Sequence, residues 1–452
     1  MNRPNILFYF TDQQRADTLG CYGQKLPISP VLDGLAQKGV LFEQAFTAQP
    51  VCGPCRALFQ TGKYPTQLNC FRNSQQLPEH VKTIADYFEE LDYETAYVGK
   101  WHLASRRFSF DRPPLEDYET TAIPLNRRGG YHGFWRAADI LEFTSHGYDG
   151  YVFDENMNKR EFKGYRVDCI TDFALEFLEQ YDGQKPFFLT ISHIEPHHQN
   201  DHNCYEGPKG SKERFSNYEL PGDLAALGGD ADEMYPDYLG CCKSLDDNLG
   251  RIVRKLEEKG IMDNTIIIFS SDHGSHFKTR NQDSHLCGGD DYKRSCHSAC
   301  LKVPLVICGP GFTGGKRIKD LVSTASLPKT FLAMAGLDVA DNMIGENLKK
   351  VADGDTEGRK NQVFAQISES RVGRCIRTQD YLYSVYAPGL NGGHIGCSEY
   401  YEEDFFYDLK TDPYELNNLA GSPDYTEIRK NLAEQLKEEM VKAGEQRPVI
   451  RC

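Results

Sequence analysis

The chain has 452 residues, of which 39% are hydrophobic and 26% charged, so it is long enough for one large globular domain and a smaller one. Its 51 Lys and Arg residues against 66 Asp and Glu residues give a net charge of −15, which argues against nucleic acid as the main partner. No apolar run approaches the ~18 residues that a membrane helix needs, so no membrane partner is expected.

Fifteen cysteines, an odd number, are scattered along the chain without the regular spacing of a disulfide scaffold. A chain of this size buries enough apolar surface to fold without disulfides, so mostly reduced thiols are expected. Residues 1–5 run straight into an apolar stretch and show none of the segments of an export signal. Both features predict a cytoplasmic protein.

The first predicted element is a buried strand over residues 5–10, a continuous apolar run that is rich in aromatic side chains. It ends abruptly in the polar residues Thr11-Asp12-Gln13. Functional sites in α/β sheets lie at the carboxyl ends of strands, and a carboxylate placed there is a candidate ligand for a divalent metal ion. The alternative is that Asp12 caps a following helix.

A helix over residues 30–36 and a strand-like alternation over 39–48 lead to the stretch Pro50-Val51-Cys52-Gly53-Pro54-Cys55-Arg56. Residues 56–58 are good helix formers, and Thr61-Gly62 is a typical helix stop. This pattern predicts that Cys52 lies where a loop enters a helix, so that free backbone N–H groups and the helix dipole can bind an anion. The alternative is an ordinary buried cysteine in a turn.

Two further strands are predicted to end in basic or imidazole side chains. The strand over residues 93–98 is followed by Gly99-Lys100-Trp101-His102, and the strand over 186–191 is followed by Ser192-His193-Ile194-Glu195-Pro196-His197. Because the net charge is negative, an anionic substrate requires local positive charge, and these strand ends can supply it. The alternative is a solvated lysine and packed histidines.

Residues 104–165 show no clear period and are rich in arginine, glycine and aromatic residues. They are expected either to form insertion loops around the mouth of a site, where such residues suit sugars and anions, or to be an irregular packed excursion. Beyond them, residues 168–180 are predicted to form an amphipathic helix, and 235–250 with 251–259 a helical hairpin.

A β-branched strand over residues 264–271 repeats the design of the first strand and ends in Asp272-His273-Gly274. From about residue 360 the pattern changes to short strands with period-2 alternation, at 363–368, 374–378 and 381–386. An amphipathic helix over 425–443 closes the chain. The expected organisation is a catalytic α/β domain over 1–358 and an α+β subdomain over 359–452, made of a small antiparallel sheet and one helix.

Three motifs occur in the order that a known family shows. Cys52-x-Pro54-x-Arg56 with Thr61-Gly62, then Gly99-Lys100-Trp101-His102, then Asp272-His273-Gly274 resemble the type I, formylglycine-dependent sulfatases of the alkaline-phosphatase superfamily. The resemblance runs from residue 5 to about 420. It departs from the usual pattern at Cys55, where serine or alanine is common, and at Gln13, where a second aspartate is common.

The resemblance implies a large mixed central sheet flanked by helices. It also implies that a formylglycine-generating maturation enzyme oxidises Cys52 and that one divalent metal ion is bound. The implied metal ligands are Asp12, Gln13, Asp272, His273 and the matured Cys52. Carboxylate and amide oxygens suit Ca²⁺ or Mg²⁺ better than zinc, and the imidazole would also suit Mn²⁺.

The resemblance further implies roles for the basic and imidazole side chains of these motifs. The implied assignments are Arg56 and His102 for the formylglycine hydrate, Lys100 and Lys293 for the sulfate, and His197, or else His193, for the bridging oxygen of the ester.

The sequence therefore predicts a sulfatase that hydrolyses a sulfate monoester, and the loops rich in Arg, Tyr, His and Asn favour a sulfated mono- or oligosaccharide. One alternative is a hydrolase of phosphonate monoesters or phosphodiesters from the same superfamily, which also has a single Asp-Gln pair. A second is a non-catalytic relative that binds sulfated glycans. The retention of every polar motif at its strand end argues against that second alternative.

Overall fold

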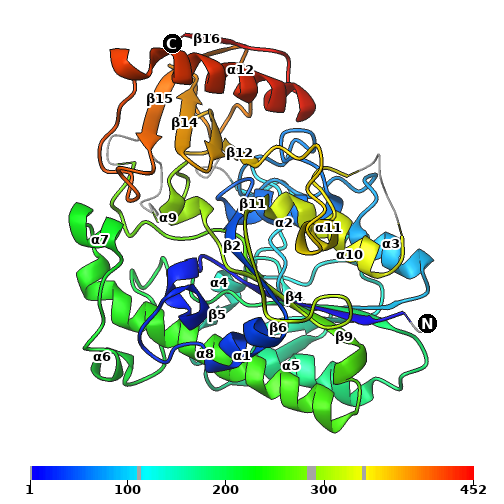
Figure 1. The fold of residues 1–452 in the computed structure, drawn as a ribbon. Helices are drawn as coiled ribbons and strands as arrows, with labels where there is room; N and C mark the ends of the chain where they lie inside the picture. Colours follow the sequence, from blue (N-terminus) through cyan, green and yellow to red (C-terminus); the bar gives the residue numbers. More distant parts are fainter. Residues whose placement is uncertain (1–2, 109–112, 282–291, 338–342, 452) are drawn as a thin grey trace.

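The computed structural model describes residues 3–108, 113–281, 292–337 and 343–451. Its main feature is a large mixed sheet whose strands follow the order β11-β2-β10-β9-β1-β8-β3-β4-β6-β5, with β7 paired to β6 (Figure 1). In that order, the strands are β11 (Lys316–Ser323), β2 (Val40–Phe46), β10 (Leu305–Cys308), β9 (Thr265–Ser271), β1 (Asn5–Thr11), β8 (Phe187–Ser192), β3 (Glu94–Lys100), β4 (Phe134–Ala138), β6 (Asp149–Asp154), β5 (Ser145–His146) and β7 (Lys159–Lys163).

The four strands at the centre of this sheet run parallel to one another. β1 pairs in parallel with β8 and with β9, and β8 pairs in parallel with β3. Their carboxyl ends therefore meet at one edge, which brings the residues after each strand together. β10 is antiparallel to both of its neighbours, which makes the sheet mixed. The predicted fold class is confirmed.

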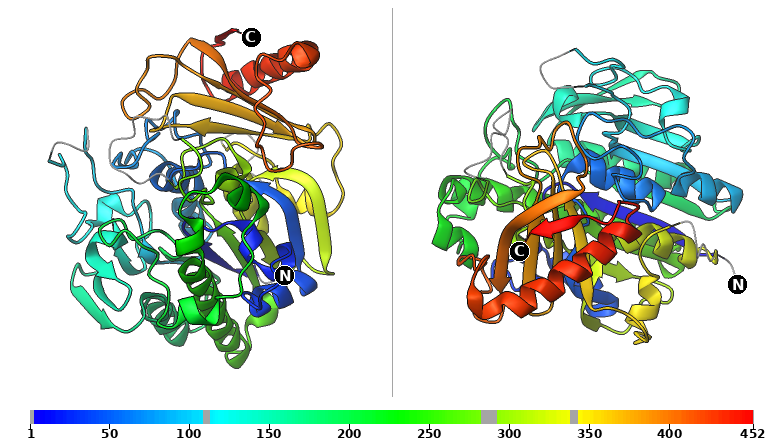
Figure 2. Two further views of the ribbon diagram at one scale, coloured as in Figure 1. Left: turned by 90° about the vertical axis from the view of Figure 1, so that its left-hand side faces the viewer. Right: turned by 90° about the horizontal axis from the view of Figure 1, so that it is seen from above.

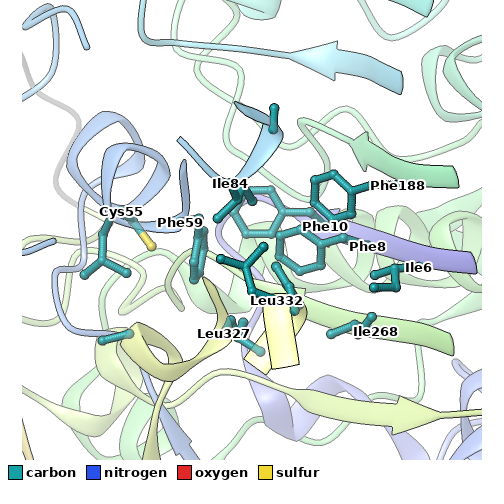
Figure 3. Close-up of a cluster of buried hydrophobic side chains, with 14 of the residues drawn as sticks. Ile6, Phe8, Phe10, Cys55, Phe59, Ile84, Phe188, Ile268, Leu327 and Leu332 are labelled. Carbon is teal, nitrogen blue, oxygen red and sulfur yellow. The ribbon is translucent and has the colours of Figure 1, made fainter. Parts of the chain in front are cut away.

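The side chains of β1 enter two apolar layers, one on each face of the sheet. Phe8 and Phe10 pack with Phe59 and Phe188 in the first layer (Figure 3), whereas Leu7 and Tyr9 enter the second. A strand buried on both faces reads as a continuous apolar run, which is why this element was predictable. Burial of each such phenylalanine contributes about 1.5–3 kcal/mol.

Helices cover both faces of the sheet (Figure 1). The helices on the face that Phe8 enters are α2 (Cys52–Thr61), α3 (Ile84–Glu90), α10 (Leu327–Met334) and α11 (Leu348–Ala352). Those on the opposite face are α1 (Pro30–Lys38), α5 (Arg166–Gln180) and α8 (Ala231–Glu258). Four short helices lie in the connections: α4 (Leu141–Thr144), α6 (Ser211–Arg214), α7 (Gly222–Leu227) and α9 (Ser298–Leu301).

The predicted helical hairpin over residues 235–259 is wrong, because α8 is one helix of 28 residues. The helix continues through Gly250, where a Cβ would lie 3.0 Å from Val31 of α1, so the glycine allows close helix packing. Pro236 has no N–H, so the carbonyl of Asp232 lacks its helical donor. The Tyr218 hydroxyl donates to that carbonyl instead, at 2.7 Å. Within the described ranges, no helix is long and apolar enough to cross a membrane.

Residues 104–165 contain strands β4 to β7 at one end of the central sheet. Their arginines are engaged in packing: the Arg128 guanidinium lies over the Trp135 ring and donates to the carbonyl of Ile123. Arg136 pairs with Glu155 and Glu176. Arg128 and Arg136 are packed, as the second alternative expected, but neither alternative predicted strands in this segment.

The C-terminal part of the chain forms a second sheet, which lies against one end of the molecule (Figure 2). Its strands are β12 (Gln362–Ile367), β13 (Gly373–Thr378), β14 (Tyr381–Tyr386), β15 (Tyr400–Asp408) and β16 (Val449–Arg451). All pairs are antiparallel except β15 with β16. Helix α12 (Thr426–Lys442) packs Leu432, Leu436 and Met440 on this sheet. The boundary at residue 358 stays a prediction, since an apolar cluster joins Phe46 to Val363.

Gly99, in β3, has a φ of +105°, and a Cβ there would lie 2.0 Å from the carbonyl oxygen of Ser192 on β8. Gly99→Ala should therefore lower the free energy of unfolding by about 2–4 kcal/mol, the sum of backbone strain and overpacking. Denaturant unfolding measures this change. The matched control is Gly34→Ala in α1, where nothing lies within 4 Å of a Cβ. A helix gains stability from that change, so equal destabilisation by both would contradict the prediction.

Candidate active site

Cys52 is the first residue of α2, and its side chain is at the centre of the converging strand ends. Its Sγ lies 3.3 Å from Asp12 Oδ1, 3.3 Å from His273 Nε2 and 3.2 Å from Lys293 Nζ. Asp12 follows β1 and His273 follows β9, as predicted. Cys52 is only 1% exposed, and burial raises the pKa of its thiol to about 12. The thiol is therefore protonated and is not itself a nucleophile at neutral pH.

Asp12 is a fully buried carboxylate that two cations hold in its charged form. Its Oδ2 accepts hydrogen bonds from Lys100 Nζ at 2.7 Å and from Arg56 Nη2 at 3.0 Å. Burial opposes ionisation, but Lys100 and Arg56 together keep the pKa of Asp12 well below its usual range. The Arg56 guanidinium is oriented from its other side by Ser192, which accepts from Nη1 at 2.6 Å.

Asp272 is the second buried carboxylate, and it is the less well compensated of the two. Its Oδ1 accepts from the backbone N–H groups of Gln13 at 2.9 Å and His273 at 2.8 Å. No hydrogen-bond donor among the described residues reaches Oδ2, and Arg56 Nη2 stays 3.8 Å away. Burial and the nearby charge of Asp12 raise the pKa of Asp272 to about 7.

These features fit a bound divalent cation. Ligand atoms of Asp12, Cys52, Asp272 and His273 all lie within 4.8 Å of one another. His273 Nδ1–H donates to the carbonyl of Gly274, which leaves Nε2 with a lone pair, and burial lowers the pKa of His273 to about 3. A neutral imidazole and two carboxylates with an unsatisfied oxygen are suitable ligands, and a cation would offset the repulsion between the carboxylates.

Gln13 contacts the Asp272 carboxylate through its backbone N–H. Its side-chain Oε1 accepts from the backbone N–H of His198 at 3.2 Å, and its Nε2 donates to Ser275 at 3.4 Å. An amide oxygen has two lone pairs, so the bond from His198 leaves one for a metal ion. The ligand role of Gln13 stays a prediction.

Of the two histidines after β8, the structure brings His197 to the site. Lys293 Nζ donates to His197 Nε2 at 2.7 Å, and Nδ1 lies 2.6 Å from the carbonyl of His198. The bonds are compatible with a neutral ring that carries its proton on Nδ1. His193 lies elsewhere: its ring contacts Tyr9, and burial and Arg166 lower its pKa to about 3. The assignment of the bridging oxygen to His197 rather than to His193 stays a prediction.

His102 lies beside the cationic cluster with a positive φ of 61°. Burial first, and then Lys100 and Arg56, keep the pKa of His102 well below its usual value, so the ring is neutral. Asp139 holds this segment by accepting from the backbone N–H groups of three successive residues, 103, 104 and 105. Asp139 was missed in the sequence because no motif marks it.

Fewer N–H groups are free at the start of α2 than expected. The Gly53 N–H donates to Asn73 Oδ1 at 2.9 Å, and the Cys55 N–H donates to the carbonyl of Val51. Pro54 has no N–H to offer. Local positive charge at the site therefore comes chiefly from lysine and arginine side chains.

A residue from the C-terminal part of the chain supports the site, and no sequence motif marks it. Glu369 follows β12, and its Oε1 accepts from the backbone N–H of Asn73 at 2.7 Å. Its Oε2 pairs with Arg294, the residue after Lys293. One carboxylate thus links the segment that holds the start of α2 to the segment that carries Lys293.

The comparison with protein families gives two matches. The sulfatase model matches residues 4–337, and the model of the C-terminal region of N-sulphoglucosamine sulphohydrolase matches residues 290–442. The first match covers well over half of the chain, so the protein belongs to the sulfatase family, and it has the alkaline-phosphatase-like fold of that family. It is therefore a sulfuric ester hydrolase.

Two curated relatives are similar over nearly the whole chain. One is an ulvan-active sulfatase of Formosa agariphila, 27% identical, with 98% of this chain and 82% of the relative covered. The other is an N-acetylglucosamine-6-O-sulfatase of Bacteroides thetaiotaomicron, 26% identical, with 96% and 86% covered.

Solved structures share the fold. The crystal structure of the putative sulfatase yidJ of Bacteroides fragilis superimposes with a TM-score of 0.80 at 23% identity and covers 98% of this chain and 96% of its own. A structure in complex with its substrate D-glucosamine-2-N,6-O-disulfate superimposes with a TM-score of 0.76 at 22% identity, with 99% of each chain covered. The phosphonate monoester hydrolase of Agrobacterium radiobacter superimposes with a TM-score of 0.71 at 21% identity, with 98% of this chain and 96% of the hydrolase covered.

Asp272→Asn tests the fit of a cation, because it removes one buried negative charge and keeps an acceptor for both backbone N–H groups. In chelator-treated protein, Ca²⁺ at 100-fold excess over Kd should raise the free energy of unfolding of the wild type by about 2–3 kcal/mol. The same Ca²⁺ should leave the free energy of unfolding of the variant unchanged. Thermal unfolding with and without Ca²⁺ measures this difference. Asp263→Asn, at an exposed position, is the control and should respond like the wild type. Equal stabilisation of the wild type and Asp272→Asn would count against the site.

Proposed function

We propose that this sulfatase hydrolyses sulfate monoesters of a mono- or oligosaccharide through a formylglycine at position 52 and one divalent metal ion. The observation that carries the proposal is the position of Cys52 Sγ, within 3.3 Å of Asp12 Oδ1, His273 Nε2 and Lys293 Nζ. A nucleophile placed there is next to both the metal ligands and a cation that can hold the sulfate.

The choice of a sulfated sugar is supported by what the similar proteins act on. Both curated relatives are described as acting on carbohydrate sulfates, ulvan in one case and N-acetylglucosamine 6-O-sulfate in the other. The structure solved with D-glucosamine-2-N,6-O-disulfate also has a sulfated amino sugar as its substrate. We therefore propose a sulfated sugar for this chain as well.

Asp12, Asp272, His273 and the oxygen of the matured residue 52 would hold the ion, with Gln13 as a further ligand. When bound, the ion neutralises the carboxylates, polarises a sulfate oxygen and makes a hydroxyl of the formylglycine hydrate more acidic, so that this hydroxyl can attack sulfur. Calcium is the preferred ion because carboxylates dominate the set, and Mg²⁺ or Mn²⁺ are the alternatives.

Lys100 and Lys293 stabilise the charge of the reacting sulfate. Lys100 is held against Asp12, and Lys293 lies 3.2 Å from Cys52 Sγ, so both ammonium groups are fixed before the substrate arrives. Negative charge remains on the terminal sulfate oxygens as the S–O bond breaks, and preorganised cations stabilise it without reorganisation. Arg56, fixed by Asp12 and Ser192, orients the hydrate.

His197 and His102 move the protons. The hydroxyl that attacks sulfur gives up its own proton to solvent. As the new S–O bond to residue 52 forms and the ester S–O bond breaks, the leaving alcohol oxygen takes the proton shared between Lys293 and His197 Nε2. Sulfate then leaves residue 52 when the second hydroxyl of the hydrate gives its proton to neutral His102, whose Nδ1 has no hydrogen-bond partner among the described residues. The bond that breaks in this step joins the carbon of residue 52 to the oxygen that carries the sulfate, and its cleavage restores the aldehyde.

Hydrolysis of phosphonate monoesters or phosphodiesters is the second candidate. It is favoured by the single Asp12-Gln13 pair, which puts one carboxylate fewer around the ion than a pair of aspartates does. A phosphonate monoester is also a tetrahedral anion with one leaving oxygen, so the same lysines would serve it.

Cys52→Ala should fold normally and lose at least about 10³-fold in kcat, because alanine can be neither matured nor used as a nucleophile. Activity on an aryl sulfate, after co-expression with a formylglycine-generating enzyme, measures the loss. The peptide that spans residue 52 should show the mass of formylglycine in the wild type only. Cys55→Ser, which keeps a small polar side chain one helical turn on, is the control and should retain activity. Full turnover by Cys52→Ala would refute the mechanism.

The substrate class is tested with matched leaving groups and a panel of sulfated sugars. We expect kcat/KM for an aryl sulfate to exceed that for the corresponding aryl phosphonate, and a sulfated amino sugar to exceed the aryl sulfate because the remote sugar contacts lower the barrier. Steady-state kinetics on the matured enzyme measures both ratios. A preference for the phosphonate would favour the second candidate function. Activity on the aryl sulfate but on none of the sulfated sugars would exclude the proposed sugar substrate.

A further inference from the structure

A second group of metal-binding side chains lies outside the Cys52 site. His146 ends β5, and Asp201 and His202 lie in the loop after β8. One ligand atom from each of these three residues lies within 4.8 Å of the other two. His146 Nε2 is 2.8 Å from Asp201 Oδ2. The imidazole rings of His146 and His202 are stacked, with their centroids 4.3 Å apart and an angle of 11° between the ring planes.

We propose that His146, Asp201 and His202 form a surface site for a divalent transition metal ion, with Zn²⁺ as the preferred ion. Two imidazoles and one carboxylate are a common three-residue ligand set for zinc, whereas Ca²⁺ and Mg²⁺ require more oxygen ligands. A fourth position is left to solvent. Nothing in the proposed hydrolysis of sulfate esters uses these three residues.

Neighbouring side chains already orient the ligands. Glu206 Oε1 lies 2.6 Å from His202 Nδ1, so Nδ1–H donates to this carboxylate and Nε2 keeps its lone pair for an ion. Gln199 Nε2 donates to Asp201 Oδ1 at 2.7 Å, which leaves Oδ2 as the ligand atom. Partners of this kind fix the tautomer of a metal-binding histidine and raise its basicity.

The backbone that carries the ligands is held in place as well. The N–H of Gln199 donates to the carbonyl of Cys204 at 2.8 Å, so Asp201 and His202 lie at the tip of a short closed loop. His146 pairs with Asp149 of β6. Because both supports exist without the ion, binding does not have to order the loop first.

The proposed site differs from the Cys52 site in both access and chemistry. The side chains of His146, Asp201 and His202 are 42%, 56% and 46% exposed, so an ion can enter and leave directly from solvent. The ligands at the Cys52 site are buried and include two carboxylates. The two sites therefore favour different ions, Ca²⁺ at the buried site and Zn²⁺ at the surface site.

The test is a calorimetric titration of Zn²⁺ into chelator-treated full-length protein in the presence of excess Ca²⁺. We expect binding that is lost in His146→Ala and in His202→Ala, and that is weakened about 10-fold in Glu206→Gln. Cys52→Ala should retain it, which distinguishes this site from the buried one. His132→Ala is the matched control, because His132 forms a similar exposed pair with Glu89 at 2.8 Å, and no second histidine of the described residues joins that pair in a metal-ligand cluster.

A second measurement uses Cu²⁺ as a spectroscopic probe of the same ligands. Its electron paramagnetic resonance spectrum should show coupling to two imidazole nitrogens in the wild type and to one in either histidine variant. Absence of Zn²⁺ binding, or binding unchanged by His146→Ala and His202→Ala, would overturn the proposal. An equal loss in His132→Ala would also overturn it, since a lone histidine–carboxylate pair would then explain the signal.

Discussion

The repulsion between two buried carboxylates is the constraint on which the active site depends. Asp12 and Asp272 lie in the interior at the ends of β1 and β9, where an uncompensated charge is strongly unfavourable. Lys100 and Arg56 compensate Asp12, but Asp272 has a pKa raised to about 7 and an oxygen that no donor among the described residues reaches. The charge of the proposed cation would offset the repulsion between the two carboxylates.

The parallel centre of the sheet brings these groups together, and this part of the site was predictable from sequence. Runs such as 6–10 and 266–269 are apolar throughout because both faces of the strands are buried, so their ends could be located to within two residues. Asp12 and Asp272 follow directly after β1 and β9, and Lys100 is the last residue of β3. Cys52 and Arg56 were predictable because the turn, the helix formers and the glycine stop surround them.

Other parts were not predictable, because long-range contacts determine them. His193 and His197 follow the same strand, and only the path of the chain after β8 shows that the first enters the Tyr9 layer and the second meets Lys293. The predicted hairpin divided α8 after residue 250, because no local pattern reports that Gly250 packs closely against Val31 of α1. Glu369 is 296 positions from Asn73 along the chain, and no local pattern reports such a contact.

The burial of Cys52 has a consequence for when the proposed oxidation takes place. The side chain is 1% exposed, and every residue of α2 is buried between the sheet and its neighbours. A second protein cannot reach that sulfur without pulling the helix out of the interior. The proposed maturation enzyme would therefore have to act on the growing or still unfolded polypeptide, so that synthesis, chemical modification and folding would follow one another in a fixed order.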